Sequence, residues 1–166
     1  QATRFQPIMT ENLEDVKFPF KTPEQLSQYL PYLITRLTNR WQVKQDADLK
    51  DIGVQGATMR ILACLGAYKQ LTVNELSVLS VTEQSTVSRL VEQLVTAGMA
   101  QREIDATDQR VRRVSLTAKG RKKLKETAPV INRNYHNMTD DIDPAQLAVC
   151  VEVMQAMLKK IRVHDL

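Results

Sequence analysis

Five polar side chains near the middle of the chain are of types that can read nucleic-acid bases. They are Gln84, Ser85, Thr86, Ser88 and Arg89. A glutamine amide matches the hydrogen-bonding edge of adenine, an arginine matches guanine, and hydroxyl groups bond either base edges or phosphates. Apolar residues recur among and after them at three- and four-residue spacing. They are Val87, Leu90, Val91 and Leu94. This spacing predicts a helix that buries its apolar stripe and presents the five polar residues outward, although an ordinary solvated helix fits the same pattern.

A cluster of positive charge follows this predicted helix. Positions 110 to 125 contain eight basic residues and no acidic one, whereas the whole chain has a net charge of only +4. The eight are Arg110, Arg112, Arg113, Lys119, Arg121, Lys122, Lys123 and Lys125. Such concentration is typical of a surface that binds a phosphate backbone. A charged run is often only a solvated face, but its place beside a candidate base-reading helix favours nucleic acid.

Capping residues divide the chain into the helices that must position these side chains. Thr22, followed by Pro23, predicts a helix start, and Pro31 should kink that helix or separate its first turn. A second helix is predicted between Gly53 and Gly66. A third, short helix follows Thr72, whose capping-box pattern includes Glu75. The candidate base-reading helix should then be capped by Thr82 and end at Gly98.

The second half of the chain predicts a hairpin and two long helices. Residues 99–105 and 111–116 are expected to form a β-hairpin with a long polar tip. Helices should begin after Thr117 and Asp143 and carry apolar stripes in the 4-3-4-3 spacing of a coiled-coil seam. The stripes are Leu124, Ala128, Ile131, Tyr135 and Met138, then Leu147, Val151, Met154, Leu158 and Ile161. The predicted fold is mainly α with a small β-hairpin wing (α+β), a winged helix-turn-helix DNA-binding lobe flanked by terminal dimerisation helices.

Other function classes find little support. The sequence contains no nucleophile, phosphate-loop or dinucleotide motif, so we expect no enzyme. Cys64 and Cys150 are far apart and are expected to be small buried hydrophobes, with no metal site and no cofactor. No long apolar run or signal-peptide pattern appears, which predicts a cytoplasmic protein without a membrane partner. A winged-helix protein-interaction module without DNA binding is the alternative from another class.

Several short motifs resemble those of the MarR family of bacterial regulators. The wing pattern Asp-x-x-Asp-x-Arg followed by Leu-Thr-x-x-Gly is carried by Asp105, Asp108, Arg110, Leu116, Thr117 and Gly120. The likeness in element order covers residues 22–164. It implies a dimerisation region at 22–47 and 117–164 and a DNA-binding winged helix-turn-helix at 54–116.

The resemblance also implies how such a protein would act. A homodimer would place two recognition helices in successive major grooves of double-stranded DNA and two wings on the flanking minor grooves, on a pseudo-palindromic operator. Arg110 would enter the minor groove, oriented by a salt bridge from Asp108, with Arg112 and Arg113 also on the wing. The usual outcome in the family is repression.

Family members usually respond to a small effector, often an aromatic or phenolic acid. The candidate effector residues here are Tyr29, Tyr32, Arg36, Trp41 and Met59, each of which also fits a place in the core or an interface. Residues 1–21 form an N-terminal extension that contains all three phenylalanines, Phe5, Phe18 and Phe20. We expect this extension to dock on the helical region.

Overall fold

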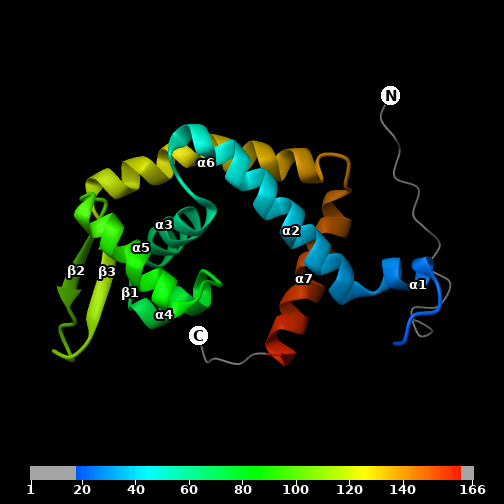
Figure 1. Ribbon diagram of the computed structural model, residues 1–166, viewed down its shortest axis with the longest axis horizontal. Coiled ribbons are helices and arrows are strands. Elements are labelled where there is room, and N and C mark those ends of the chain that lie inside the picture. Colours follow the sequence, from blue (N-terminus) through cyan, green and yellow to red (C-terminus); the bar gives the residue numbers. More distant parts are fainter. Residues whose placement is uncertain (1–17, 162–166) are drawn as a thin grey trace. The chain divides into compact units, whose positions relative to one another are not determined.

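A computed structural model describes residues 18–161 (Figure 1). They fall into two units, which divide between Ala47 and Asp48. In the first unit lie α1 (Pro23–Gln28) and most of α2 (Leu30–Leu49). The Thr22 hydroxyl accepts a hydrogen bond from the backbone N–H of Gln25 at 3.3 Å, which confirms the predicted cap. Extended backbone at Tyr29 separates the two helices, so Pro31 lies at the second position of α2, where its missing N–H costs little. The expected break at Pro31 is confirmed.

The second unit contains the predicted order of elements. After a short 3-10 helix, η2 (Lys50–Ile52), come α3 (Gly56–Tyr68), β1 (Gln70–Leu71), α4 (Val73–Leu79) and α5 (Gln84–Thr96). The wing consists of β2 (Ala100–Ile104) and β3 (Arg112–Leu116), and the unit ends with α6 (Ala118–Thr139) and α7 (Pro144–Lys160). This is a mainly helical winged helix-turn-helix, as predicted.

The sheet has one strand more than the hairpin that the sequence predicted. Its order is β1-β3-β2, with both pairs antiparallel, so the return strand of the wing lies in the centre. Gln101 pairs with Ser115 on the β2 side, and Leu71 pairs with Val114 on the β1 side. The two-residue strand β1 thereby ties the wing to the segment between α3 and α4.

One hydrophobic core holds the helix-turn-helix and the wing together. The predicted stripe of α5 is buried in it, together with leucines of α3 and α4 and the inner residues of the sheet. Val87 and Val91 of α5, Leu76 of α4 and Val114 of β3 are wholly inaccessible to solvent. Burying the stripe leaves the opposite side of α5 exposed, as a base-reading helix requires.

Two predicted helix boundaries are wrong. α3 continues through Gly66 to Tyr68, and the chain turns at Lys69 with a φ of 71°. Gly66 instead allows close packing, since a Cβ there would lie 2.5 Å from the side chain of Leu124 in α6. α5 is capped by Glu83 rather than Thr82. Gly98 has the predicted left-handed conformation, with a φ of 68°.

The long helices α6 and α7 expose much of their apolar surface. Thr117 and Asp143 cap them as predicted, through bonds to the backbone N–H groups of Gly120 and of Ala145 and Gln146. α7 buries none of its residues. The large apolar side chains exposed on the two helices include Tyr135, Met138, Val151, Met154 and Leu158. Among residues 18–161, no helix combines the length and apolar character needed to span a membrane.

Candidate nucleic-acid interface

The turn between α4 and α5 is held by a set of specific hydrogen bonds. The capping box of α4 is complete: Thr72 accepts from the N–H of Glu75 at 3.2 Å, and Glu75 accepts from the N–H of Thr72 at 2.7 Å. The Arg60 guanidinium of α3 donates to the carbonyl of Ser80 at 2.9 Å. The Ser77 hydroxyl donates to the carbonyl of Thr82 at 2.7 Å. These contacts fix the angle at which α5 leaves α4.

The five predicted base-reading residues lie in the first two turns of α5. Gln84, Ser85, Ser88 and Arg89 are exposed, and Thr86 is half-buried. The Gln84 amide donates to the side-chain oxygen of Asn74 in α4 at 2.6 Å, which holds it near the N-terminus of α5. Arg89 makes no side-chain hydrogen bond or ion pair within the described part of the chain, so its guanidinium can reach outward.

An acidic residue, Glu83, caps this helix. The sequence pattern predicted Thr82 at this position, and Glu83 was missed. Its carboxylate accepts from the backbone N–H of Thr86 at 3.2 Å and from the hydroxyl of Ser85. The Ser85 hydroxyl bond, together with backbone N–H groups of Ser85 and Thr86, lowers the pKa of Glu83. The negative charge therefore occupies the helix end that would otherwise attract a phosphate. The sequence did contain a signal for this cap: Glu83 stands three residues before Thr86, the spacing between an N-cap side chain and the N3 backbone N–H that it accepts from.

The tip of the wing is organised around Asp105. Its carboxylate accepts from the N–H of Thr107 at 2.8 Å, from the Thr107 hydroxyl at 2.6 Å and from the N–H of Asp108 at 3.2 Å. The same carboxylate pairs with the Arg113 guanidinium of β3, which also lies 3.7 Å from Glu75 of α4. The bond from the Thr107 hydroxyl, then that from Arg113, holds the pKa of Asp105 far below its usual range. Arg113 thus links the wing to α4 and is not simply available for DNA.

The salt bridge expected between Asp108 and Arg110 is absent from the described residues. The Asp108 carboxylate instead accepts from the backbone N–H of Arg110 at 2.9 Å, which shapes the turn. The Arg110 side chain is exposed and makes no hydrogen bond or ion pair there. The neighbouring Arg112 donates to the carbonyl of Gln109 at 2.7 Å. Within residues 18–161, Arg110 is therefore the wing arginine whose side chain has no partner.

Part of the basic run serves the fold. Lys119 donates to the carbonyl of Ala97 at 2.8 Å, and Arg121 donates to that of Leu116 at 2.6 Å. Lys123 pairs with Glu126 at 2.9 Å. Lys122 and Lys125 make no hydrogen bond or ion pair with the described chain. The run carries the predicted positive charge, but fewer of its side chains are available to bind DNA than the sequence implied.

The candidate effector residues are divided between the two units. Tyr29, Tyr32, Arg36 and Trp41 belong to the first unit, where the Arg36 guanidinium lies 5.5 Å from the centroid of the Tyr32 ring. Tyr29 contacts the ring of Phe20 at a centroid distance of 4.9 Å. Met59 belongs to the second unit and is buried in a small cluster with Leu49 and Val54. The five residues stay a hypothesis. Phe5 and the rest of residues 1–17 lie outside the described residues.

The cysteines do not form a reactive pair. Cys64 is half-buried, and burial raises the pKa of its thiol, with Arg60 acting in the opposite direction. Cys150 is exposed on α7, so the expectation that both cysteines are buried is wrong. In the described ranges, no group of three or more His, Cys, Asp or Glu side chains could hold a metal ion.

We predict that Asp105→Asn loosens the tip of the wing. The amide keeps one acceptor oxygen but cannot satisfy Thr107, Asp108 and Arg113 together, and it loses the ion pair. Amide hydrogen exchange at residues 105–111 should accelerate, while exchange in α3 should not change. Because the pKa of Asp105 is lowered by folding, its contribution is present above the normal carboxyl range and is lost as the pH falls through and below that range. Equal exchange in the two proteins at neutral pH would contradict this account of the tip.

Comparison with known proteins agrees with this geometry. Residues 52–111 match the sequence model of the MarR family. The structure also superposes on a MarR family transcriptional regulator from Silicibacter pomeroyi DSS, with a TM-score of 0.81 and 42% sequence identity over 86% of this chain and 95% of that one. No match is found among curated proteins. The chain belongs to the MarR family and is a DNA-binding transcriptional regulator rather than an enzyme.

Two more distant structures share the fold. A mutant MarR from E. coli complexed with operator DNA is 18% identical, with a TM-score of 0.67, over 80% of this chain and 97% of that one. Bordetella bronchiseptica BpsR, whose DNA binding is regulated by 6-hydroxynicotinic acid, is 21% identical, with a TM-score of 0.69, over 79% and 94%.

Proposed function

We propose that the protein is a cytoplasmic homodimer that represses transcription by binding a pseudo-palindromic operator. The observation that carries this proposal is the exposed polar face of α5, next to a wing whose exposed Arg110 has no side-chain partner among residues 18–161. A helix presents base-reading side chains to the major groove in this way, and a free wing arginine suits the electronegative minor groove. The operator complex of the E. coli relative supports the same use of the fold.

The dimer is supported by the apolar surface that one chain leaves uncovered. Val151 is 45% exposed and Leu158 is 64% exposed on α7, and Leu37 is 52% exposed on α2. Side chains of this kind, repeated along helices, are typical of an interface. We therefore assign residues 22–47 and 117–164 to dimerisation and residues 54–116 to DNA binding. Two-fold symmetry would then place the half-sites about one helical turn apart.

Individual roles follow from the contacts of each side chain. Gln84 and Arg89 would read bases, with Ser85, Thr86 and Ser88 bonding base edges or phosphates. Arg110 would enter the minor groove, and Asp108 would set its direction through the backbone rather than through a salt bridge. Arg112 would lie over the phosphates. Arg113 would position the wing by its contacts with Asp105 and Glu75.

Control by a small molecule completes the proposal. The regulation of BpsR by 6-hydroxynicotinic acid supports an aromatic or phenolic acid as the class of effector. Tyr29, Tyr32, Arg36, Trp41 and Met59 are the candidates for binding it, because they offer aromatic walls and one cation for a carboxylate.

The test is selection from a random pool of DNA duplexes at two salt concentrations. We expect a palindromic motif of about 16–20 base pairs and binding that weakens steeply with salt. A protein that selects no sequence, or that ignores salt, would instead be a protein-interaction module on the same fold.

The same selection repeated with Gln84→Ala tests how α5 reads bases. We expect one position in each half-site to lose its preference, at a cost of about 1–3 kcal/mol for the original base. Glu152→Ala, on α7, is the control and should select the unchanged motif. An unaltered motif with Gln84→Ala would mean that Gln84 does not face a base.

A further inference from the structure

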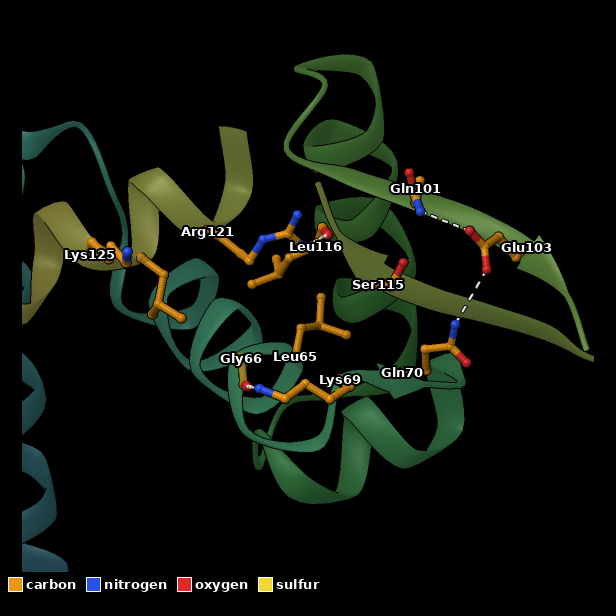
Figure 2. A pocket seen from close by; sticks show the side chains of 11 residues that line it. Leu65, Gly66, Lys69, Gln70, Gln101, Glu103, Ser115, Leu116, Arg121 and Lys125 are labelled. Carbon is orange, nitrogen blue, oxygen red and sulfur yellow. Dashed lines mark hydrogen bonds between the residues drawn. The ribbon is translucent and has the colours of Figure 1, made fainter. Parts of the chain in front are cut away.

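A pocket lies within the second unit, and none of the five candidate effector residues lines it. It has a volume of about 420 Å³ and is lined by α3, the sheet and the start of α6 (Figure 2). This volume is in the range of small-molecule sites and suits a one-ring compound. Its lining comes from five elements that are distant in sequence, and it includes both strands of the wing.

The two ends of the pocket differ in charge. Arg121 and Lys125 lie four residues apart on the same side of α6 and supply two cations at one end. At the other end, Glu103 of β2 accepts from the amide of Gln101 at 2.8 Å and from that of Gln70 at 3.3 Å. Leu65 and Leu116 lie between the two ends (Figure 2). Lys69, a third cation of the lining, follows α3 and donates to the carbonyl of Gly66 at 2.9 Å. The pocket is therefore apolar in its middle, with two cations on α6, one cation engaged at the end of α3, and an acidic group on the wing.

The cationic end has unused binding capacity. One nitrogen of Arg121 donates to the carbonyl of Leu116 at 2.6 Å, which fixes the guanidinium and leaves other N–H groups to donate. Lys125 makes no hydrogen bond or ion pair with the described chain. An anion there would gain charge-assisted hydrogen bonds, whereas near Glu103 it would be repelled.

We propose that this pocket binds a small organic carboxylate, with its carboxylate on Arg121 and Lys125 and its apolar ring over Leu65 and Leu116. Binding would also act on DNA affinity, a part that rests on the proposed function. The ligand would neutralise Lys125, a member of the basic run, and join the wing strands to α6. Because phosphate binding depends on the charge of the basic run, an occupied pocket should weaken DNA binding.

The first experiment titrates the free protein with benzoate and records amide shifts by NMR. We expect saturable shifts at residues 65–66, 101–103 and 115–116. Lys125→Gln should weaken benzoate binding by about fivefold, because one charge-assisted bond is lost. Lys122→Gln is the matched control, since it removes the same charge from α6 at a residue that does not line the pocket. Benzamide, which has the same ring and no charge, should bind more weakly than benzoate.

The possible outcomes separate the site from its regulatory effect. Absence of saturable shifts up to tens of millimolar benzoate, or equal weakening by Lys125→Gln and Lys122→Gln, overturns the site. A second experiment measures DNA affinity with and without benzoate, as a ratio for each variant. We expect benzoate to reduce the affinity of the wild-type protein and to have less effect on Lys125→Gln. If benzoate leaves the DNA affinity of the wild-type protein unchanged, the proposed regulation is overturned. If the protein binds no DNA at all, the proposed function is contradicted, and the NMR titration alone decides whether the site exists.

Discussion

Gly120→Ala should lower the free energy of unfolding by about 3 kcal/mol, the upper end of the usual cost of overpacking. A Cβ at this position would lie 1.9 Å from the carbonyl oxygen of Met99 and 3.1 Å from the side chain of Leu116. The Met99 carbonyl cannot withdraw freely, because it accepts from the N–H of Thr117 at 3.1 Å. The Thr117 hydroxyl also donates to the carbonyl of Gly98 at 2.7 Å, so the start of α6 is tied to the start of the wing. Urea unfolding followed by circular dichroism measures the loss.

Gly98→Ala is the matched control for this prediction. Gly98 has a φ of 68°, but no atom lies within 4 Å of the position of its Cβ. Alanine there should cost only its left-handed conformation, about 1–2 kcal/mol. If Gly120→Ala and Gly98→Ala lowered the free energy of unfolding equally, the close approach of α6 to the Met99 carbonyl would not be what requires glycine at position 120.

Arg110→Ala should weaken binding to the selected operator by about 1–3 kcal/mol, or roughly five- to 150-fold. The guanidinium is exposed and unpaired in the described chain, so its removal should leave thermal stability unchanged. If Arg110 neutralises the charge of a phosphate-lined minor groove, the slope of log affinity against log salt should also fall by about one. Fluorescence anisotropy with a labelled duplex at several salt concentrations measures both quantities.

Lys159→Ala provides the control for charge alone. Lys159 lies in the last turn of α7 and outside the proposed DNA-binding region. Its removal subtracts the same unit of charge and should change neither the affinity nor the slope appreciably. Equal losses in the two variants would assign the effect of Arg110 to net charge, and not to a contact in the minor groove.

Much of this fold could be predicted from local chemistry. Thr22, Thr72, Thr117 and Asp143 are side chains that bond the free N–H groups at a helix start, and all four cap helices where predicted. The stripe of α5 followed from the helical period. These features depend on residues within a few positions of one another, which is why one sequence is enough to recognise them.

Some errors arose where a distant part of the chain decides the role of a residue, and others arose within a turn, where several nearby partners compete for one side chain. Gly66 was predicted to end a helix, but its small size accommodates Leu124 of α6. Asp108 was expected to pair with the Arg110 side chain, but the turn brings a backbone N–H within reach first. The pocket beside Arg121 and Lys125 could not be predicted, since five elements must fold before it exists.

The lack of buried residues in α7 has a consequence for how much protein a cell must hold. A helix that its own chain does not cover gains little from folding alone, and its partner must supply the missing burial. The stability of the proposed dimer would then depend on concentration. When the protein becomes scarce, pairs separate and two half-sites are no longer held by one molecule. Abundance alone could therefore release a target gene, without any ligand.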